Sequence, residues 1–89
     1  MASLPYTMTV ALYADILLLE RDVRSLMRCQ GNTCAFLQSA EYKTLKFAMM
    51  RGGAFEPQTI HIPHSNLVMQ VSSGLTVTIQ GESCRAAVV

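Results

Sequence analysis

The chain has 89 residues and a formal net charge of +1, with seven basic and six acidic side chains. About half of its residues are hydrophobic and only 15% are charged. A chain of this length forms one domain, residues 1–89, and so apolar a composition excludes an intrinsically disordered protein. The balanced charge provides no general attraction to nucleic acid or to an anionic membrane. The scarcity of charge predicts exposed apolar surface, which self-association or a partner would cover.

The first two predicted elements are a strand and a helix. Tyr6, Met8 and Val10 alternate with polar residues, so we expect a strand over residues 5–11. A helix is predicted at about 13–29, where apolar residues recur at spacings of four and three: Leu12, Ile16, Leu19, Val23 and Leu26. Leu17 and Leu18 widen this apolar stripe, which favours a second contact surface against a partner subunit.

The middle of the chain has two interpretations. A period of two from Lys43 places Leu45, Phe47 and Met49 on one face, which predicts a short helix followed by a strand at 43–50. One continuous helix over 33–50 is the alternative, because Phe36, Ala40 and Phe47 also fit helical spacing. The Arg51-Gly52-Gly53 sequence ends the element in both cases.

The last third of the sequence has the pattern of antiparallel strands. A short strand over 59–62 runs into Pro63. Two longer strands, at about 67–72 and 75–80, alternate apolar with polar residues around a tight Ser73-Gly74 turn. Residues 82–89 have no clear period and are expected to be a flexible or docking tail.

These elements together predict an α+β fold. We expect one long amphipathic helix packed on a small antiparallel sheet with a C-terminal β-hairpin. Such a sheet has one buried face and one face open to water or to a partner.

Three cysteines and two histidines are the candidates for a metal site. Cys29, Cys34, His61 and His64 together have the composition of a structural zinc site. The cysteines lack the usual CxxC spacing, and Pro63 separates the histidines, so we interpret all four as ordinary side chains and expect no metal or other cofactor.

The N-terminal sequence has no basic region before its short apolar run, which indicates neither a secretory signal nor a membrane span. Free thiols in a reducing cytoplasm are the expectation.

Catalytic signatures are weak throughout the chain. A nucleophilic cysteine needs a lowered pKa, whereas Cys29 is predicted near a helix C-terminus, where the dipole raises it. The sequence contains no GxSxG, and Arg51-Gly52-Gly53 lacks the phosphate-loop pattern. We therefore expect a protein that is not an enzyme.

Protein binding as a homodimer is the function that composition favours. The chain would be a small regulatory or inhibitory accessory protein of the type that phages, other viruses and mobile elements encode. The candidate partner-binding residues are Leu17, Leu18, Met50, Val68, Gln70, Thr76 and Thr78. A nucleic-acid-binding regulator with a helix-turn-helix and a β-hairpin wing is the alternative, with Lys43, Lys46 and Arg51 on its second helix.

Overall fold

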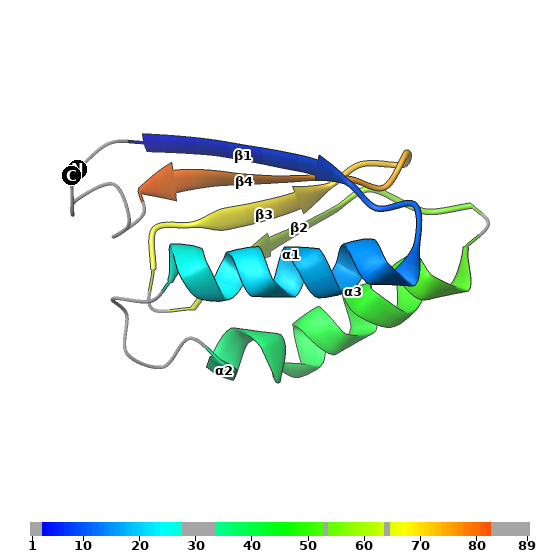
Figure 1. Cartoon of the computed structure of the whole chain (residues 1–89), viewed down its shortest axis with the longest axis horizontal. Helices are drawn as coiled ribbons and strands as arrows, with labels where there is room; N and C mark the ends of the chain where they lie inside the picture. The colour runs from blue at the N-terminus through cyan, green and yellow to red at the C-terminus, as the bar shows by residue number, and fades with distance from the viewer. Residues whose placement is uncertain (1–2, 28–33, 53, 64, 83–89) are drawn as a thin grey trace.

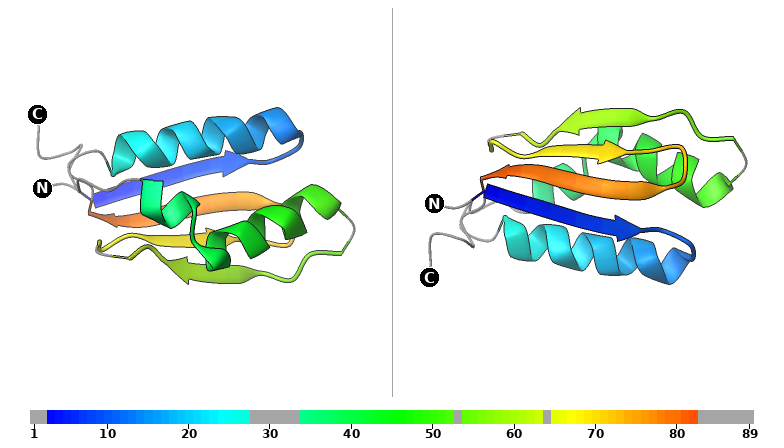
Figure 2. Two further views of the ribbon diagram at one scale, coloured as in Figure 1. Left: turned by 90° about the horizontal axis from the view of Figure 1, so that it is seen from below. Right: turned by 90° about the horizontal axis from the view of Figure 1, so that it is seen from above.

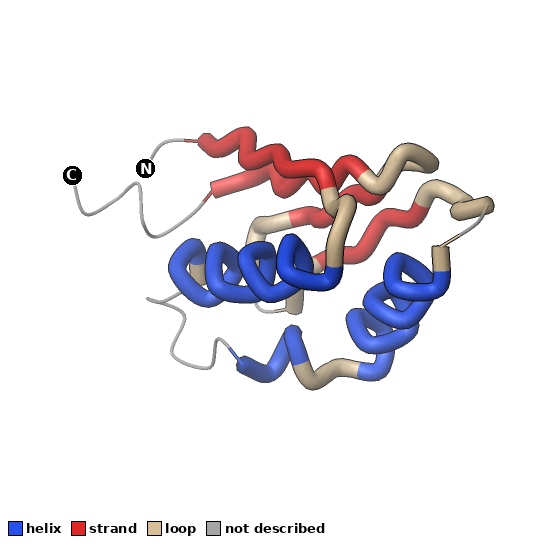
Figure 3. Tube along the Cα trace, turned by 45° about the vertical axis from the view of Figure 1, so that its right-hand side comes forward, coloured by secondary structure: helices blue, strands red, loops and turns tan. Residues whose placement is uncertain are grey.

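A four-stranded antiparallel sheet and a layer of helices make up the protein (Figure 1). The structure, a computed structural model, describes residues 3–27, 34–52, 54–63 and 65–82. The elements in chain order are β1 (Ser3–Thr9), α1 (Tyr13–Leu26), α2 (Cys34–Leu37), α3 (Ala40–Arg51), β2 (Gln58–His61), β3 (Val68–Val71) and β4 (Thr76–Glu82). The helices lie on the same side of the sheet, which leaves two layers (Figure 3).

The sheet order is β1-β4-β3-β2, so the first and last strands are neighbours. Tyr6 lies opposite Ile79, and Thr7 lies opposite Thr78. The β3–β4 pair is the predicted C-terminal hairpin, with Val71 opposite Val77. Seen from above, the sheet lies in front of the helices, and no described helix covers its near side (Figure 2).

The core lies between the sheet and the helices. Alternate residues of the strands point into it, among them Ile60, Met69, Val77 and Ile79. From α1, Ile16, Leu19, Val23 and Leu26 face the sheet; α3 adds Tyr42, Leu45 and Met49. The predicted stripe of α1 is therefore the buried face of that helix, except that Leu12 lies before it and is 69% exposed.

The start of α1 is fixed by Asp15. Its carboxylate accepts hydrogen bonds from the backbone N–H groups of Ala11 and Leu12, at 2.8 and 2.9 Å. These bonds satisfy backbone donors that the helix itself leaves unpaired. They also hold the pKa of Asp15 below its usual value. The helix ends at Leu26 with Met27 as its C-cap, so it is shorter than the predicted 13–29, of which residues 28 and 29 lie outside the described residues.

The predicted strand at 43–50 is wrong, because α3 occupies Ala40–Arg51. Helical spacing buries Tyr42, Leu45 and Met49 and leaves Phe47 66% exposed, where the strand interpretation had placed Phe47 with the buried residues. The alternative of one unbroken helix over 33–50 also fails, since α2 ends at Leu37. Ser39 separates the two helices: its backbone is extended and its hydroxyl accepts from the Tyr42 N–H at 3.2 Å.

The hairpin turn between β3 and β4 contains an unusual residue. Three residues connect Ser72 to Thr76, whose backbone groups bond at 3.0 Å. The last of the three, Leu75, has φ of 56°, where glycine is the usual residue. The Leu75 carbonyl accepts from the Val10 N–H at 2.9 Å, and this bond ties the turn to the end of β1.

The α+β class is confirmed, with one change to the helix layer. Two helices, α1 and α3, pack on the sheet instead of one long helix. Of the predicted tail, only Glu82 belongs to the described residues, as the last residue of β4. In the part of the chain that the structure describes, no helix is long and apolar enough to cross a membrane.

Candidate functional site

The outer side of the sheet is a continuous polar surface, which we call the open sheet face. Its side chains alternate along each strand with the buried residues and are exposed or half-buried. The residues of the open sheet face are Thr7, Thr9, Thr59, His61, Val68, Gln70, Thr76, Thr78 and Gln80. The predicted partner-binding residues Val68, Gln70, Thr76 and Thr78 all lie on it.

Strand register places these side chains in rows that run across the sheet. One row joins Thr7, Thr78, Gln70 and Thr59, since each is the cross-strand partner of the next. Thr9 and Thr76 are also partners, with their hydroxyl oxygens 3.5 Å apart. Directly opposed residues lie on the same side of a sheet within contact distance. The rows therefore form an ordered array of hydroxyl and amide groups.

None of these nine residues is Lys, Arg, Asp or Glu, and His61 is the one titratable group among them. Glu82 ends β4 at the edge of this face. A typical soluble surface carries roughly 25–35% charged residues of both signs. Depletion of charge is typical of the centre of a protein–protein interface. In its lack of charged side chains, this face resembles the centre of an interface.

A second surface feature lies at one end of the molecule, which we call the helix-end cleft. The β1–α1 connection, the β3–β4 turn and the C-terminal end of α3 meet there (Figure 1). The cleft has a volume of about 190 Å³ and is lined by Val10, Ala11, Leu12, Tyr13, Ile16, Met49, Met50 and Leu75. Leu12, Tyr13 and Met50 are 69%, 53% and 47% exposed, so apolar surface surrounds the opening.

A buried charged network joins the two helices beside this cleft. Glu20 is only 8% exposed, and one of its carboxylate oxygens accepts from the Tyr42 hydroxyl at 2.7 Å. The same oxygen lies 3.0 Å from Nζ of Lys46. That ammonium is also 6.0 Å from the centre of the Tyr13 ring. Burial and the bond to Glu20 raise the pKa of Tyr42 above its usual value. The network neutralises Glu20 and fixes α3 against α1.

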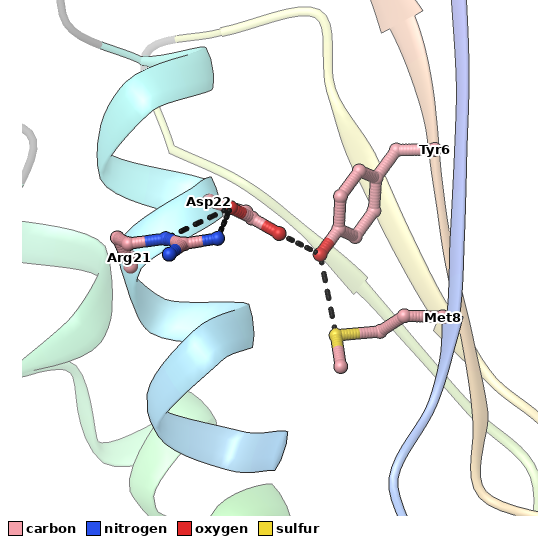
Figure 4. A network of polar contacts seen from close by, with 4 residues as sticks. All are labelled: Tyr6, Met8, Arg21 and Asp22. Carbon is pink, nitrogen blue, oxygen red and sulfur yellow. Dashed lines mark hydrogen bonds and ion pairs between the residues drawn. The ribbon is translucent and has the colours of Figure 1, made fainter. Parts of the chain in front are cut away.

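A smaller network joins α1 to β1 on the other side of the helix. The Tyr6 hydroxyl donates to the Asp22 carboxylate at 2.6 Å and lies 3.2 Å from the Met8 sulfur, while Arg21 pairs with the other Asp22 oxygen at 3.2 Å (Figure 4). Burial and the bond to Asp22 raise the pKa of Tyr6. Every polar group here has a partner within the chain, so the network has a structural role.

The seven predicted partner-binding residues do not form one surface. Leu17 is 48% exposed and lies one helical turn after Tyr13, on the side of α1 that holds Glu20. Met50 is in the wall of the helix-end cleft. Leu18, 42% exposed, is one turn before Asp22 and lies toward β1. The remaining four are on the open sheet face, in the other layer of the molecule.

The predicted nucleic-acid residues are also divided. Lys46 is half-buried and paired with Glu20, whereas Lys43 and Arg51 are exposed on α3. Exposed Phe47 and Met50 lie between these two basic residues along the helix. The surface of α3 is therefore mixed apolar and basic, and it is not a continuous basic stripe.

Of the four residues weighed as zinc ligands, His61 belongs to the open sheet face. Cys34 is the first residue of α2. Cys29 and His64 lie outside the described residues, as does Cys84, so the structure does not test a zinc site that includes them. Within the described ranges, no three His, Cys, Asp or Glu side chains are grouped closely enough to hold a metal ion.

Sequence reasoning missed Leu12, Tyr13 and Leu75 as surface residues. Leu12 extended the periodic stripe of the helix, and only its position before the first helical turn signals exposure. Leu75 continued the alternation with Val77 and Ile79, and nothing in that alternation reveals a positive φ.

Comparison of the chain with protein-family models, with curated proteins and with solved structures found no match.

Proposed function

We propose that the protein is a small non-enzymatic regulatory protein that forms a homodimer through its open sheet face and acts by binding another protein. The observation that supports this proposal best is that the nine residues of the open sheet face, which come from four adjacent strands, include no Lys, Arg, Asp or Glu. Interface centres are depleted of charge because an unpaired buried charge is costly.

A second copy is the occupant that best matches the chemistry of this face. In a two-fold dimer each surface meets its own copy, so a charged face would meet like charge. Threonine hydroxyls and glutamine amides each donate and accept hydrogen bonds, and two copies can therefore satisfy each other. Thr7, Thr78 and Gln70 supply such groups in one central row.

The area of the open sheet face limits the expected affinity of self-association. With strands about 4.8 Å apart and about 3.4 Å per residue, a four-stranded face about five residues deep has roughly 300 Å² of flat area. Standard stable interfaces bury about 800 Å² per partner. We therefore expect reversible self-association with a dissociation constant in the micromolar range or weaker.

Sedimentation equilibrium over a range of protein concentrations tests the dimer. Thr78→Glu places a charge in the central row, so the two-fold mate brings a second like charge opposite it, and the variant should be monomeric. Thr44→Glu is the matched control, because Thr44 is an exposed threonine of α3 in the helix layer, and it should associate like the parent. A parent protein that is monomeric at all concentrations, or equal association of both variants, would contradict the proposal.

The nucleic-acid alternative predicts a different result. Binding to duplex probes would weaken steeply with salt, because each phosphate contact releases counterions. Lys43→Ala together with Lys46→Ala would weaken it further. Binding with these properties, and no self-association, would replace the proposed function with the alternative.

A further inference from the structure

We propose that the helix-end cleft binds one bulky apolar side chain from an acidic segment of a partner protein. The inference rests on the protein-binding part of the proposed function and is independent of self-association through the open sheet face. Three properties of the cleft support it: its size, the strained residue in its wall and the charge of the neighbouring helix.

The size of the cleft fits a single side chain. Its volume is about 190 Å³. An apolar cavity of about 150 Å³ holds a benzene ring. A phenylalanine or leucine side chain is therefore of the right size, and burying one such anchor in a pocket is how many interfaces obtain most of their affinity. The exposed side chains of Leu12, Tyr13 and Met50 would close around it.

Leu75 supplies the second observation. A positive φ costs a non-glycine residue roughly 1–2 kcal/mol, and a large apolar side chain in that conformation is uncommon. At this place in a three-residue hairpin loop, glycine would be free of strain. The chain instead places a leucine there, and its side chain lines the cleft. The Leu75 side chain also packs against the core, so it contributes to the fold and to the cleft wall together. Strained residues cluster at binding sites.

Charge identifies the class of partner. The exposed charged residues of α3 are the basic Lys43 and Arg51 and the acidic Glu41, a net charge of +1, while the charge of Lys46 is paired with Glu20. Lys46 and Met50 are one helical turn apart, so this basic helix borders the cleft. On the α1 side, the Asp15 carboxylate lies beside the cleft but is held by the backbone N–H groups of Ala11 and Leu12. A segment with Asp or Glu beside its apolar anchor therefore fits, with its acidic residues over α3.

Selection from a phage-displayed random peptide library tests the partner class directly. Enriched peptides should share a Phe, Leu or similar anchor next to Asp or Glu. Enrichment of basic peptides, or no enrichment above an unrelated immobilised protein, would overturn the proposal. The enriched peptide, labelled with fluorescein, then serves as the probe in anisotropy titrations.

Two matched variants locate the binding site. Met50→Ser should weaken binding of the labelled peptide about tenfold, because it removes part of the cleft wall. Leu18→Ser removes a similarly exposed apolar side chain away from the cleft and should change affinity less than about twofold. Equal weakening by both variants would contradict binding in the cleft.

Leu75→Asn separates binding from folding. Asparagine relieves the strain of the positive φ but loses the packing of Leu75 against the core, so the two effects on stability oppose each other. The variant should melt within a few degrees of the parent while losing at least about tenfold in peptide affinity. Retained peptide affinity would show that Leu75 has no part in binding and would contradict a binding site in the cleft that it lines.

Two further outcomes assign the cleft to another occupant. Binding to vesicles that contain phosphatidylserine, abolished by Met50→Ser and without peptide binding, would identify an anionic membrane as the target. Loss of the dimer in Met50→Ser, measured by light scattering, would make the cleft a self-association surface and overturn both proposals. A dimer that persists in Met50→Ser while peptide binding is lost would support them together.

Discussion

Gly81 is the residue whose identity the fold restricts most clearly. Its φ is 125°, a conformation that L side chains rarely adopt. A Cβ atom at this position would overlap the carbonyl oxygen of Asn66, which is backbone and cannot move aside alone. Both strain and a steric clash therefore exclude a side chain from this part of β4.

Alanine substitutions at Gly81, Gly52 and Gly74 should lower stability by successively smaller amounts. Gly81→Ala should lower the free energy of unfolding by at least about 2 kcal/mol, since it adds a clash to the strain. Gly52→Ala meets the strain of φ 74° with open space around it and should cost about 1 kcal/mol. Gly74→Ala has neither problem and should change stability by less than about 0.5 kcal/mol. Urea denaturation midpoints measure all three, and any other order contradicts the geometry.

Single residues also show where sequence reasoning stops. Glu20 is not part of the predicted apolar stripe of α1, but it is the one buried charged residue among the described side chains. Its position four residues after Ile16, next to the stripe, was a usable signal. Its partners Tyr42 and Lys46 belong to another helix, and no local pattern identifies such contacts.

At the scale of elements, local periodicity located β1, α1 and the C-terminal hairpin but misassigned the middle of the chain. In residues 43–50, a period of two and a helical period fit the apolar positions about equally well. Tyr42, just outside the window, decides between them, because Tyr42, Leu45 and Met49 form a helical stripe. Ser39, a preferred residue for helix starts, was the second signal for a new helix at this point.

The order of the strands in the sheet could not be predicted from local periodicity. The pairing of β1 with β4 joins the two ends of the described chain, and alternation along each strand says only which face is buried. The open sheet face was therefore predictable strand by strand, whereas its rows were not. The helix-end cleft was not predictable at all, because three segments distant in sequence form it.

The contact between α1 and α3 predicts how stability depends on pH. The folded protein holds the Tyr42 proton more tightly than the unfolded chain, in which tyrosine has a pKa of about 10. Above that pH the unfolded chain loses the proton first, so this contribution to stability is complete below about pH 10 and is lost as the pH rises. Tyr6 contributes in the same direction through its bond to Asp22.

Tyr42→Phe tests this link. At neutral pH the variant should lose about 1–2 kcal/mol of unfolding free energy, because Glu20 keeps Lys46 but loses a buried hydrogen-bond donor. Its stability should also fall less steeply between about pH 9 and pH 11 than that of the parent. Tyr6→Phe should flatten the same region, and the double variant should be flatter than either. Urea titrations across this pH range provide the measurement; an unchanged slope in Tyr42→Phe would contradict the predicted linkage.

At the scale of the whole molecule, the two-layer architecture separates the two candidate surfaces. The open sheet face is the outer side of the sheet layer (Figure 2). The helix-end cleft is lined by residues from the start of α1, the end of α3 and the β3–β4 turn. The core of buried apolar residues lies between them. A partner segment in the cleft therefore leaves the sheet free, so one dimer would hold two partner segments.

Independence of the two surfaces is the prediction that follows. Thr78→Glu should abolish self-association and leave peptide affinity at the cleft within about twofold, while Met50→Ser should weaken peptide affinity about tenfold and leave self-association unchanged. In the double variant the free energy of peptide binding should change by the same amount as in Met50→Ser alone, within about 0.5 kcal/mol, as expected for distant sites without shared partners. Sedimentation equilibrium and peptide anisotropy provide the measurements, each applied to the parent protein, the two single variants and the double variant. A larger coupling would show that binding in the cleft and pairing of the sheets depend on each other, and the dimer would then be part of the binding site.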